Sequence, residues 1–187
     1  MSVKTEPGNF FEDFKPGQEI VHAAPRTVTE GDVSLYTALY GSRFAVQSSD
    51  MFAISLGFEA APVDDLLVFH IVFGKTVPDI SLNAVANLGY ASGRFAGAVY
   101  PGYTLRTVSQ VIGAKENSNS KTGVVYVHST GVNQRDEPVL DFVRWVMVRK
   151  GDASSPAPET VVPDLAPFVD ERELVVPEGI SLAGYDF

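Results

Sequence analysis

Two adjacent carboxylates, Asp64 and Asp65, stand at the start of an apolar run that ends before Pro78. A carboxyl group can act as a general acid or base where its surroundings shift its pKa. Carboxylates at the start of a helix can instead accept hydrogen bonds from its free amide groups. We favour capping for both residues. The alternatives are a polar contact with a ligand or partner, and a retained catalytic acid at either position.

The three histidines, His22, His70 and His128, are scattered along the sequence. Their spacing matches no metal-binding motif, so we expect no metal. The absence of cysteine excludes a thiolate nucleophile and a disulfide. His70 lies inside the apolar run, where we favour a core histidine over a contact with a substrate. Neither His22 nor His128 has a partner that the sequence reveals.

Charge is unevenly distributed along the chain, which has 14 Lys and Arg against 23 Asp and Glu and a formal net charge of −9. Residues 151–187 hold eight acids and one base, which leaves 15 acids and 13 bases in residues 1–150. Neither part has the basic excess of a nucleic-acid-binding protein. No apolar run approaches the roughly 20 residues of a membrane-spanning helix. The first residues also lack the apolar stretch of a secretory signal, so we expect a cytoplasmic protein without membrane contact.

The pattern of apolar residues changes from helical to extended along the chain. Residues 62–77 are apolar on nearly every face of a helix, which predicts a buried helix. Segments rich in Val, Tyr, Phe and Thr follow it, separated by turn sequences, and predict an antiparallel meander. Before the buried helix the sequence predicts a strand at 18–28 that is interrupted at Pro25, and helices at 29–40 and 49–56. The strands predicted after it are 84–96, 104–115, 122–133 and 139–150. This order predicts an α+β fold in which an antiparallel sheet wraps around a central buried helix.

Residues 151–187 differ from the rest in composition, because they contain five of the twelve prolines as well as the acidic excess. Proline donates no hydrogen bond and fixes its φ angle, so this stretch is expected to be extended. We therefore divide the chain into one domain, residues 1–150, and a Pro-rich acidic extension or linker, residues 151–187. Apolar clusters in the extension indicate that it lies along the surface of the domain or of a partner.

Several continuous stretches resemble the MaoC-like hotdog hydratases and dehydratases. The stretches that carry the resemblance are 29–33 (TEGDV), 40–43 (YGSR), 64–70 (DDLLVFH), 73–90 (FGKTVPDISLNAVANLGY) and 99–105 (VYPGYTL). Within that family they are most similar to the N-terminal half of the two-domain mesaconyl-CoA hydratases, also called β-methylmalyl-CoA dehydratases. The resemblance implies a hotdog fold, an acyl-CoA substrate, addition of water to a 2-enoyl thioester or its reversal, and no cofactor beyond the CoA of the substrate.

The same resemblance places three departures at the family's catalytic positions. Ser42 stands where the family has an Asp, and Gln47 stands where it has a His. Asp64 and Asp65 stand where a His-Gly pair begins the central helix. Neither serine nor glutamine is a useful base near neutral pH. The catalytic residues of this chain are therefore unknown, with Asp64 and Asp65 as weak candidates, and Gln47, Asp65 and His70 are candidate substrate-binding residues.

In the family, the Asp and the His form a catalytic pair (the Asp/His dyad). Because this chain lacks both residues at those positions, the resemblance predicts a partner that supplies them. We expect a second hotdog domain, or a second copy in a homodimer, to complete the site and to cover the sheet face that carries Tyr126, Trp145 and Met147. Two alternatives stay open: a non-catalytic acyl-CoA-binding or assembly module, and an atypical hydratase or thioesterase that uses Asp64 or Asp65. Basic residues that could meet the CoA phosphates, although each is more often a solvated charge, are Arg43, Lys75, Arg94 and Arg106.

Overall fold

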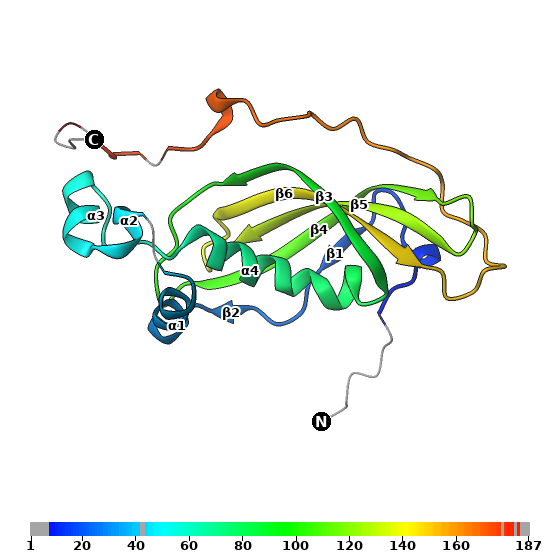
Figure 1. The fold of residues 1–187 in the computed structure, drawn as a ribbon, viewed down its shortest axis with the longest axis horizontal. Helices are drawn as coiled ribbons and strands as arrows, with labels where there is room; N and C mark the ends of the chain where they lie inside the picture. Colours follow the sequence, from blue (N-terminus) through cyan, green and yellow to red (C-terminus); the bar gives the residue numbers. More distant parts are fainter. Residues whose placement is uncertain (1–7, 42–43, 177, 182, 184–187) are drawn as a thin grey trace.

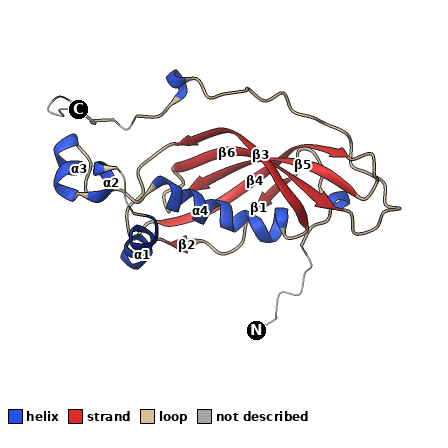
Figure 2. Ribbon diagram, in the orientation of Figure 1, coloured by secondary structure: helices blue, strands red, loops and turns tan. Residues whose placement is uncertain are grey.

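The computed structural model of the protein describes residues 8–41, 44–176, 178–181 and 183. A six-stranded antiparallel sheet has the order β1-β4-β5-β6-β3, and β2 pairs with β4 beside this path. One long helix, α4, lies across one face of the sheet, and three shorter helices gather beyond one end of it (Figures 1 and 2). The strands are β1 (Glu19–Val21), β2 (Arg26–Thr27), β3 (Ala84–Phe95), β4 (Thr104–Glu116), β5 (Thr122–Val132) and β6 (Pro138–Arg149). The helices are α1 (Glu30–Tyr40), α2 (Ala45–Ser48), α3 (Asp50–Leu56) and α4 (Asp65–Thr76), with single turns η1 (Phe11–Asp13), η2 (Val77–Ser81) and η3 (Glu171–Glu173).

The predicted sheet around a central helix is confirmed, and so are the helices α1 and α3 and the four long strands. The start of α1 is a capping box: Thr29 Oγ1 accepts from the Asp32 amide at 3.1 Å, and the Asp32 carboxylate accepts from the Thr29 amide at 2.9 Å. The extended segment predicted at 18–28, with its interruption at Pro25, is present as two short strands. The chain forms β1 and β2 with a break between them, because Ala24 takes a positive φ of 63° and Pro25 has no amide hydrogen.

The central helix α4 is held against the sheet by one face. Its buried residues Leu67, Val68, Ile71 and Val72 join a core cluster with residues of β4 and β6, among them Leu105 and Phe142. Burying a side chain of this size stabilises the fold by roughly 1.5–3 kcal/mol. Gly131 of β5 permits the close approach, because a Cβ there would lie 2.5 Å from a methyl group of Val72.

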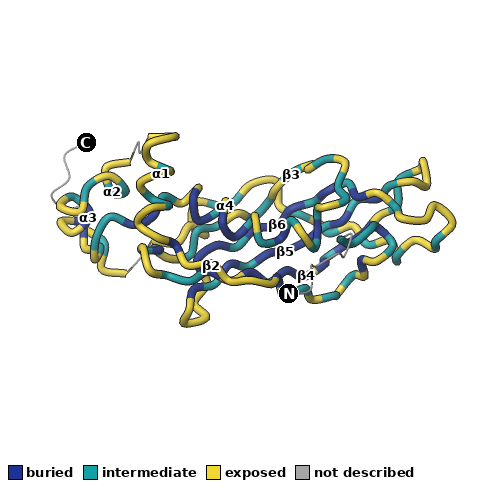
Figure 3. Tube along the Cα trace, turned by 90° about the horizontal axis from the view of Figure 1, so that it is seen from below, coloured by how far each residue is buried: buried dark blue, intermediate teal, exposed yellow. Residues whose placement is uncertain are grey.

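The opposite face of α4 is open, which differs from the predicted burial on every side. Leu66 is 57% exposed, and His70 and Gly74 are exposed as well. Exposed and buried residues alternate along α4 (Figure 3). The three exposed residues follow one another at intervals of four, so they form a stripe along one face of the helix. An apolar helix with an exposed stripe indicates a surface that this chain by itself leaves uncovered.

The chain after β6 runs back along the face of the sheet that is turned away from α4 (Figure 1). Val161 pairs with Ala114 of β4 through two backbone hydrogen bonds of 2.9 Å. Further on, Ser181 donates its amide to the carbonyl of Leu56 in α3 at 3.0 Å. The extension therefore contacts the body of the protein at Val161 and at Ser181, whereas the division of the chain at residue 150 stays a prediction.

A buried polar chain joins β1, β4 and β5 to the turn after α4. His22 is 5% exposed; its Nδ1 lies 2.7 Å from Asp79 Oδ2 and its Nε2 2.8 Å from Ser109 Oγ. The hydroxyl of Ser109 pairs with that of Ser129 at 2.7 Å. Burial lowers the pKa of His22 and outweighs the opposing pull of the Asp79 carboxylate. The folded state therefore favours the neutral ring, which can donate to Asp79 and accept from Ser109.

We expect the substitution His22→Gln to reduce the free energy of unfolding most at pH 8, by about 1–3 kcal/mol, because Asp79 and Ser109 lose a buried partner. The difference from wild type should shrink below about pH 6.5, since the unfolded chain then takes up a proton that the folded His22 resists. Urea unfolding between pH 5 and 8 measures both quantities.

His128→Gln is the matched control, with the opposite slope. Its hydrogen bond to Asp141 raises the pKa of His128, so its contribution is complete below about pH 6.5 and is lost as the pH rises through the raised value. A difference between wild type and His22→Gln that stays constant over this pH range would contradict the assignment of a neutral, buried His22.

Candidate functional site

A pocket of about 160 Å³ lies at the N-terminal end of α4. Five parts of the chain meet there: α2, the segment between α3 and α4, the first turn of α4, the end of β3 and the segment after β6. Its lining residues are Val46, Gln47, Phe58, Pro62, Asp65, Phe95, Ala96, Gly97, Ala98 and Val175. The pocket thus combines a mostly apolar wall with one amide and one carboxyl group, a pattern typical of a small-molecule site.

Gln47 reaches the pocket from α2, a helix of four residues. Among the residues that the structure describes, no group donates a hydrogen bond to the buried Oε1 of Gln47. Leaving such an acceptor unpaired costs about 1–3 kcal/mol. Gln47 also lines a smaller hollow together with Tyr36 and Asp64. A buried acceptor between two hollows can receive a hydrogen bond from a ligand.

Asp64 and Asp65 occupy the start of α4 in different ways. Asp64 is the N-cap, and its carboxylate accepts from the amide of Leu66 at 2.8 Å. Capping by Asp64 is confirmed. Asp65 lines the pocket instead, at its solvent-accessible edge. Burial by the surrounding protein, and then the charge of Asp64, raise the pKa of Asp65. A raised carboxyl pKa beside a pocket is a feature that functional sites often share.

The structure separates the other sequence candidates from this pocket. His70 lies on the open face of α4, with its ring 6.1 Å from that of Tyr36 and 5.9 Å from that of Phe69. The prediction of a core histidine is therefore wrong, because the side of α4 that carries His70 has no sheet against it. A contact of His70 with a substrate stays a prediction. Ser42 lies outside the described residues, as does Arg43.

Two histidine–carboxylate pairs exist that the sequence did not reveal. In the pair His22–Asp79 the histidine is buried and the carboxylate is partly exposed. His128 of β5 and Asp141 of β6 approach within 2.7 Å on the sheet face turned away from α4. Thr130 also donates to Asp141, at 2.8 Å. Neither pair lines the pocket of Gln47 and Asp65. Partners so distant in sequence leave no local signal.

Two of the basic candidates for phosphate binding already have acidic partners. Arg94 is paired with Glu173, and Arg106 with Asp136. Within the described parts of the chain, no group of three or more His, Asp or Glu side chains is arranged to hold a metal ion. No helix in those parts is long and apolar enough to cross a membrane.

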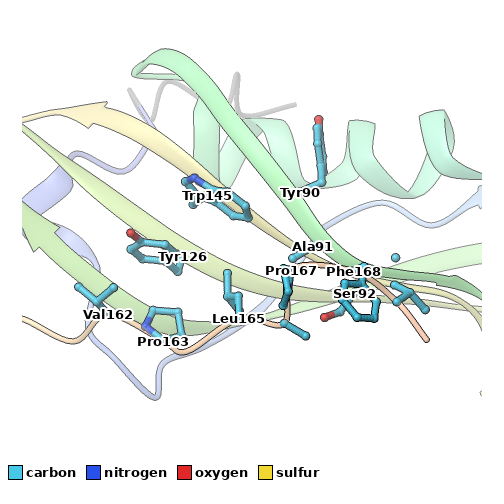
Figure 4. A pocket seen from close by; sticks show the side chains of 13 residues that line it. Tyr90, Ala91, Ser92, Tyr126, Trp145, Val162, Pro163, Leu165, Pro167 and Phe168 are labelled. Atoms are coloured by element: carbon cyan, nitrogen blue, oxygen red, sulfur yellow. The ribbon is translucent and has the colours of Figure 1, made fainter. Parts of the chain in front are cut away.

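A hollow larger than this pocket lies elsewhere, between the sheet and the segment after β6. It measures about 630 Å³ and is lined on one side by Tyr126, Trp145 and residues 90–93 of β3, and on the other by residues 162, 163 and 165–169. The side chain of Tyr90 itself points away from the hollow (Figure 4). No carboxylate, histidine, lysine or arginine is among its lining residues. The face that carries Tyr126 and Trp145 is thus covered in part by this chain itself, which corrects the expectation that a partner must cover it.

Comparison with known proteins decides the family. The model of the family described as mesaconyl-CoA hydratase matches residues 2–168. The chain belongs to the mesaconyl-CoA hydratase family. It is 69% identical over 186 residues to a β-methylmalyl-CoA dehydratase of Chloroflexus aurantiacus, and 59% identical over 184 residues to a mesaconyl-CoA hydratase of Cereibacter sphaeroides. These matches cover 100% and 98% of this chain but only 53% and 54% of the relatives, so the chain spans about half their length.

Two solved structures superpose on this chain and identify its fold. A MaoC domain protein dehydratase from Chloroflexus aurantiacus superposes with a TM-score of 0.93 at 69% identity, over 99% of this chain and 53% of the other. A Mycobacterium tuberculosis protein described as a double hotdog fold gives a TM-score of 0.69 at 26% identity, over 88% of this chain and 49% of the other. The fold of this chain is therefore a hotdog, and it corresponds to the N-terminal half of its mesaconyl-CoA hydratase relatives.

The two carboxyl groups at the start of α4 can be separated by substitution. Asp64→Asn keeps a side-chain acceptor for the Leu66 amide but removes the charge, so the pKa of Asp65 should fall toward its ordinary value while stability changes little. Asp64→Ala removes the cap as well and should cost about 1 kcal/mol. NMR titration of the Asp65 carboxyl, with urea unfolding of both variants, measures these effects. An unchanged pKa of Asp65 in Asp64→Asn would show that the two charges do not interact.

Proposed function

We propose that this chain is the half of a double-hotdog mesaconyl-CoA hydratase (β-methylmalyl-CoA dehydratase) that shapes the acyl end of the site, while the other half supplies the Asp/His dyad. The proposal is carried by the pocket at the start of α4. Its polar side chains are an amide, Gln47, with a buried unpaired acceptor, and a carboxyl, Asp65, with a raised pKa. No histidine is among its lining residues.

Hydration of an enoyl-CoA requires catalytic groups beyond Gln47 and Asp65. Hydration of a 2-enoyl thioester removes a proton from water as its oxygen attacks the β-carbon, and delivers a proton to the α-carbon; dehydration reverses both steps. A base and an acid must therefore stand near the double bond. The amide of Gln47 does not titrate near neutral pH, so it cannot be that base. Gln47 and Asp65 are suited to orient the acyl group by hydrogen bonds, with the CoA thioester as substrate and no further cofactor.

The free edge of β3 and the exposed side of α4 are the surface on which we expect a partner to dock. Within the described part of the chain, β3 is paired with β6 alone, so its other edge is free. Apolar side chains are exposed on and before this edge and on the neighbouring face of α4, namely Leu66, Leu82, Val85, Leu88 and Tyr90. A free edge beside exposed apolar side chains is a hazard unless something covers it. We propose that a second hotdog domain covers it in a cytoplasmic enzyme, and a homodimer is the alternative occupant.

The likeness to a double hotdog fold supports this arrangement, and so does the length of the relatives, of which this chain matches about half. A second candidate function rests on Asp65 alone. Because its pKa is raised and it lines the pocket, Asp65 could act as the acid of an atypical hydratase or thioesterase without a partner. A non-catalytic acyl-CoA-binding module is the third reading of the same pocket.

The test compares the chain alone with the chain combined with the C-terminal half of the Chloroflexus aurantiacus relative. Hydration of mesaconyl-CoA, followed by the loss of the conjugated enoyl absorbance, should be at least about 10³-fold faster for the combination, because in our proposal only the combination contains the Asp/His dyad. Turnover by the chain alone at the combined rate would contradict the proposal, whereas binding of acyl-CoA without turnover in either sample would favour the module.

Asp65→Asn in the combined enzyme separates orientation from acid catalysis. We expect a loss of kcat/KM of about tenfold, the effect of one lost contact to the substrate. A loss above about 10²-fold that appears in kcat rather than KM would identify Asp65 as the catalytic acid. Asp64→Asn keeps the helix cap and the lining of this pocket but lowers the pKa of Asp65, so kcat/KM should change little if Asp65 only orients the substrate.

A further inference from the structure

The segment after η3 is fixed to the body of the protein at two points. Upstream, Glu173 forms an ion pair with Arg94 near the end of β3. Downstream, the amide of Ser181 bonds the carbonyl of Leu56 at the end of α3 at 3.0 Å. Gly57 makes the second contact possible: a Cβ on Gly57 would lie 2.5 Å from the carbonyl oxygen of Gly179, so only a glycine admits the segment there.

Between these two anchors, Val175 reaches the pocket of Gln47 and Asp65. It is the one lining residue contributed from beyond β6 among those described, and it stands beside walls that come from α2, the segment before α4 and the end of β3. The side chain is 47% exposed, so one side of it forms the pocket wall while the other meets solvent. The following residue, Val176, is 72% exposed and does not line the pocket.

We propose that Val175 is a specificity-determining residue, which closes the outer wall of this pocket and limits the length of the acyl group in a 2-enoyl-CoA substrate. The inference rests on the proposed function of the site. The pocket holds about 160 Å³, close to the roughly 150 Å³ cavity that accommodates benzene. A group of about six non-hydrogen atoms fits this space, which matches the part of a mesaconyl group that lies beyond its thioester carbonyl. A longer chain would have to displace the segment that carries Val175.

The Arg94–Glu173 ion pair is weak enough for the segment that carries Val175 to be displaced. The side chains of Arg94 and Glu173 are 38% and 51% exposed, and an ion pair so exposed shifts an equilibrium by no more than about fivefold. The segment that carries Val175 is therefore not a rigid barrier. A longer acyl group binds less well because part of its binding free energy is used to displace this segment. Removing the Arg94–Glu173 ion pair should therefore favour longer acyl groups, as shortening Val175 does, but to a smaller extent.

The experiment uses this chain combined with the C-terminal half, and measures kcat/KM for mesaconyl-CoA and for straight-chain 2-enoyl-CoAs of four, six and eight carbons. Val175→Ala should raise the ratio of the six-carbon to the four-carbon value by about tenfold, the effect of one or two methylene groups in an apolar pocket. Val175→Phe should lower that ratio and weaken binding of the four-carbon substrate. Val176→Ala, the same change one residue further on, should leave the ratio as in wild type.

An unchanged ratio in both Val175 variants would overturn the inference, and so would an equal change in Val176→Ala. Equilibrium binding of butyryl-, hexanoyl- and octanoyl-CoA, measured by calorimetry on the same samples, keeps the test independent of turnover. If no variant hydrates any enoyl-CoA, the proposed function fails, whereas a preference for longer acyl chains in Val175→Ala still supports the wall. Absence of acyl-CoA binding to every sample would overturn it.

Removal and reversal of the charges of Arg94 and Glu173 test the role of their ion pair. Glu173→Gln should shift the ratio up to about fivefold toward the longer substrate, because the segment is released more often. Arg94→Glu should have the same effect, and the combination of Arg94→Glu with Glu173→Arg should restore the wild-type ratio. A ratio that responds to Val175→Ala but to neither single anchor variant would overturn the role of the anchor.

Discussion

The fold depends on the packing of one side of α4 against the sheet. Four apolar residues of this helix join the core with β4 and β6, and Gly131 provides the room for Val72. The same helix carries an exposed stripe of Leu66, His70 and Gly74 on its other side. A helix that is apolar nearly all round is stable in water only when each side is covered. The chain satisfies that condition on one side, and the free edge of β3 lies beside the side that it leaves open.

The candidate site is a consequence of where α4 begins. Asp64 ends the preceding loop and caps the helix, which places Asp65 in the first turn at the edge of the pocket. The short helix α2 brings the amide of Gln47 to the same place, and residues from the end of β3 close the apolar wall. These groups can hold and orient an acyl group, and no histidine is among the lining residues. That composition agrees with the proposal that a second hotdog half supplies the Asp/His dyad.

Local patterns in the sequence were sufficient for most of the fold. The capping box at Thr29 and Asp32, the apolar run of α4 and the alternation in the four long strands each predict their own element, because these signals lie within a few residues of one another. The open face of α4 could not be predicted, since hydropathy records which residues are apolar and not which neighbours the chain provides for them. The four residues of α2 are too few for a periodic signal.

The site was predictable only in part for the same reason. Gln47 and Asp65 were expected from family resemblance, and the pocket brings them together. The partners of His22 and His128 lie 57 and 13 residues away, and Val175 comes from a stretch that its prolines mark only as extended. Such contacts are set by the path of the folded chain, which no local pattern encodes.

Hydrogen exchange of this chain, alone and combined with the C-terminal half of its Chloroflexus aurantiacus relative, tests most directly whether the open face is where a second domain docks. Our account predicts that the combination slows exchange by about tenfold or more in β3 and in α4, which carries the exposed stripe. The amides of residues 161–169, on the opposite side of the sheet, should exchange as before. A stable complex in which β3 and α4 exchange as fast as in the chain alone would contradict the account.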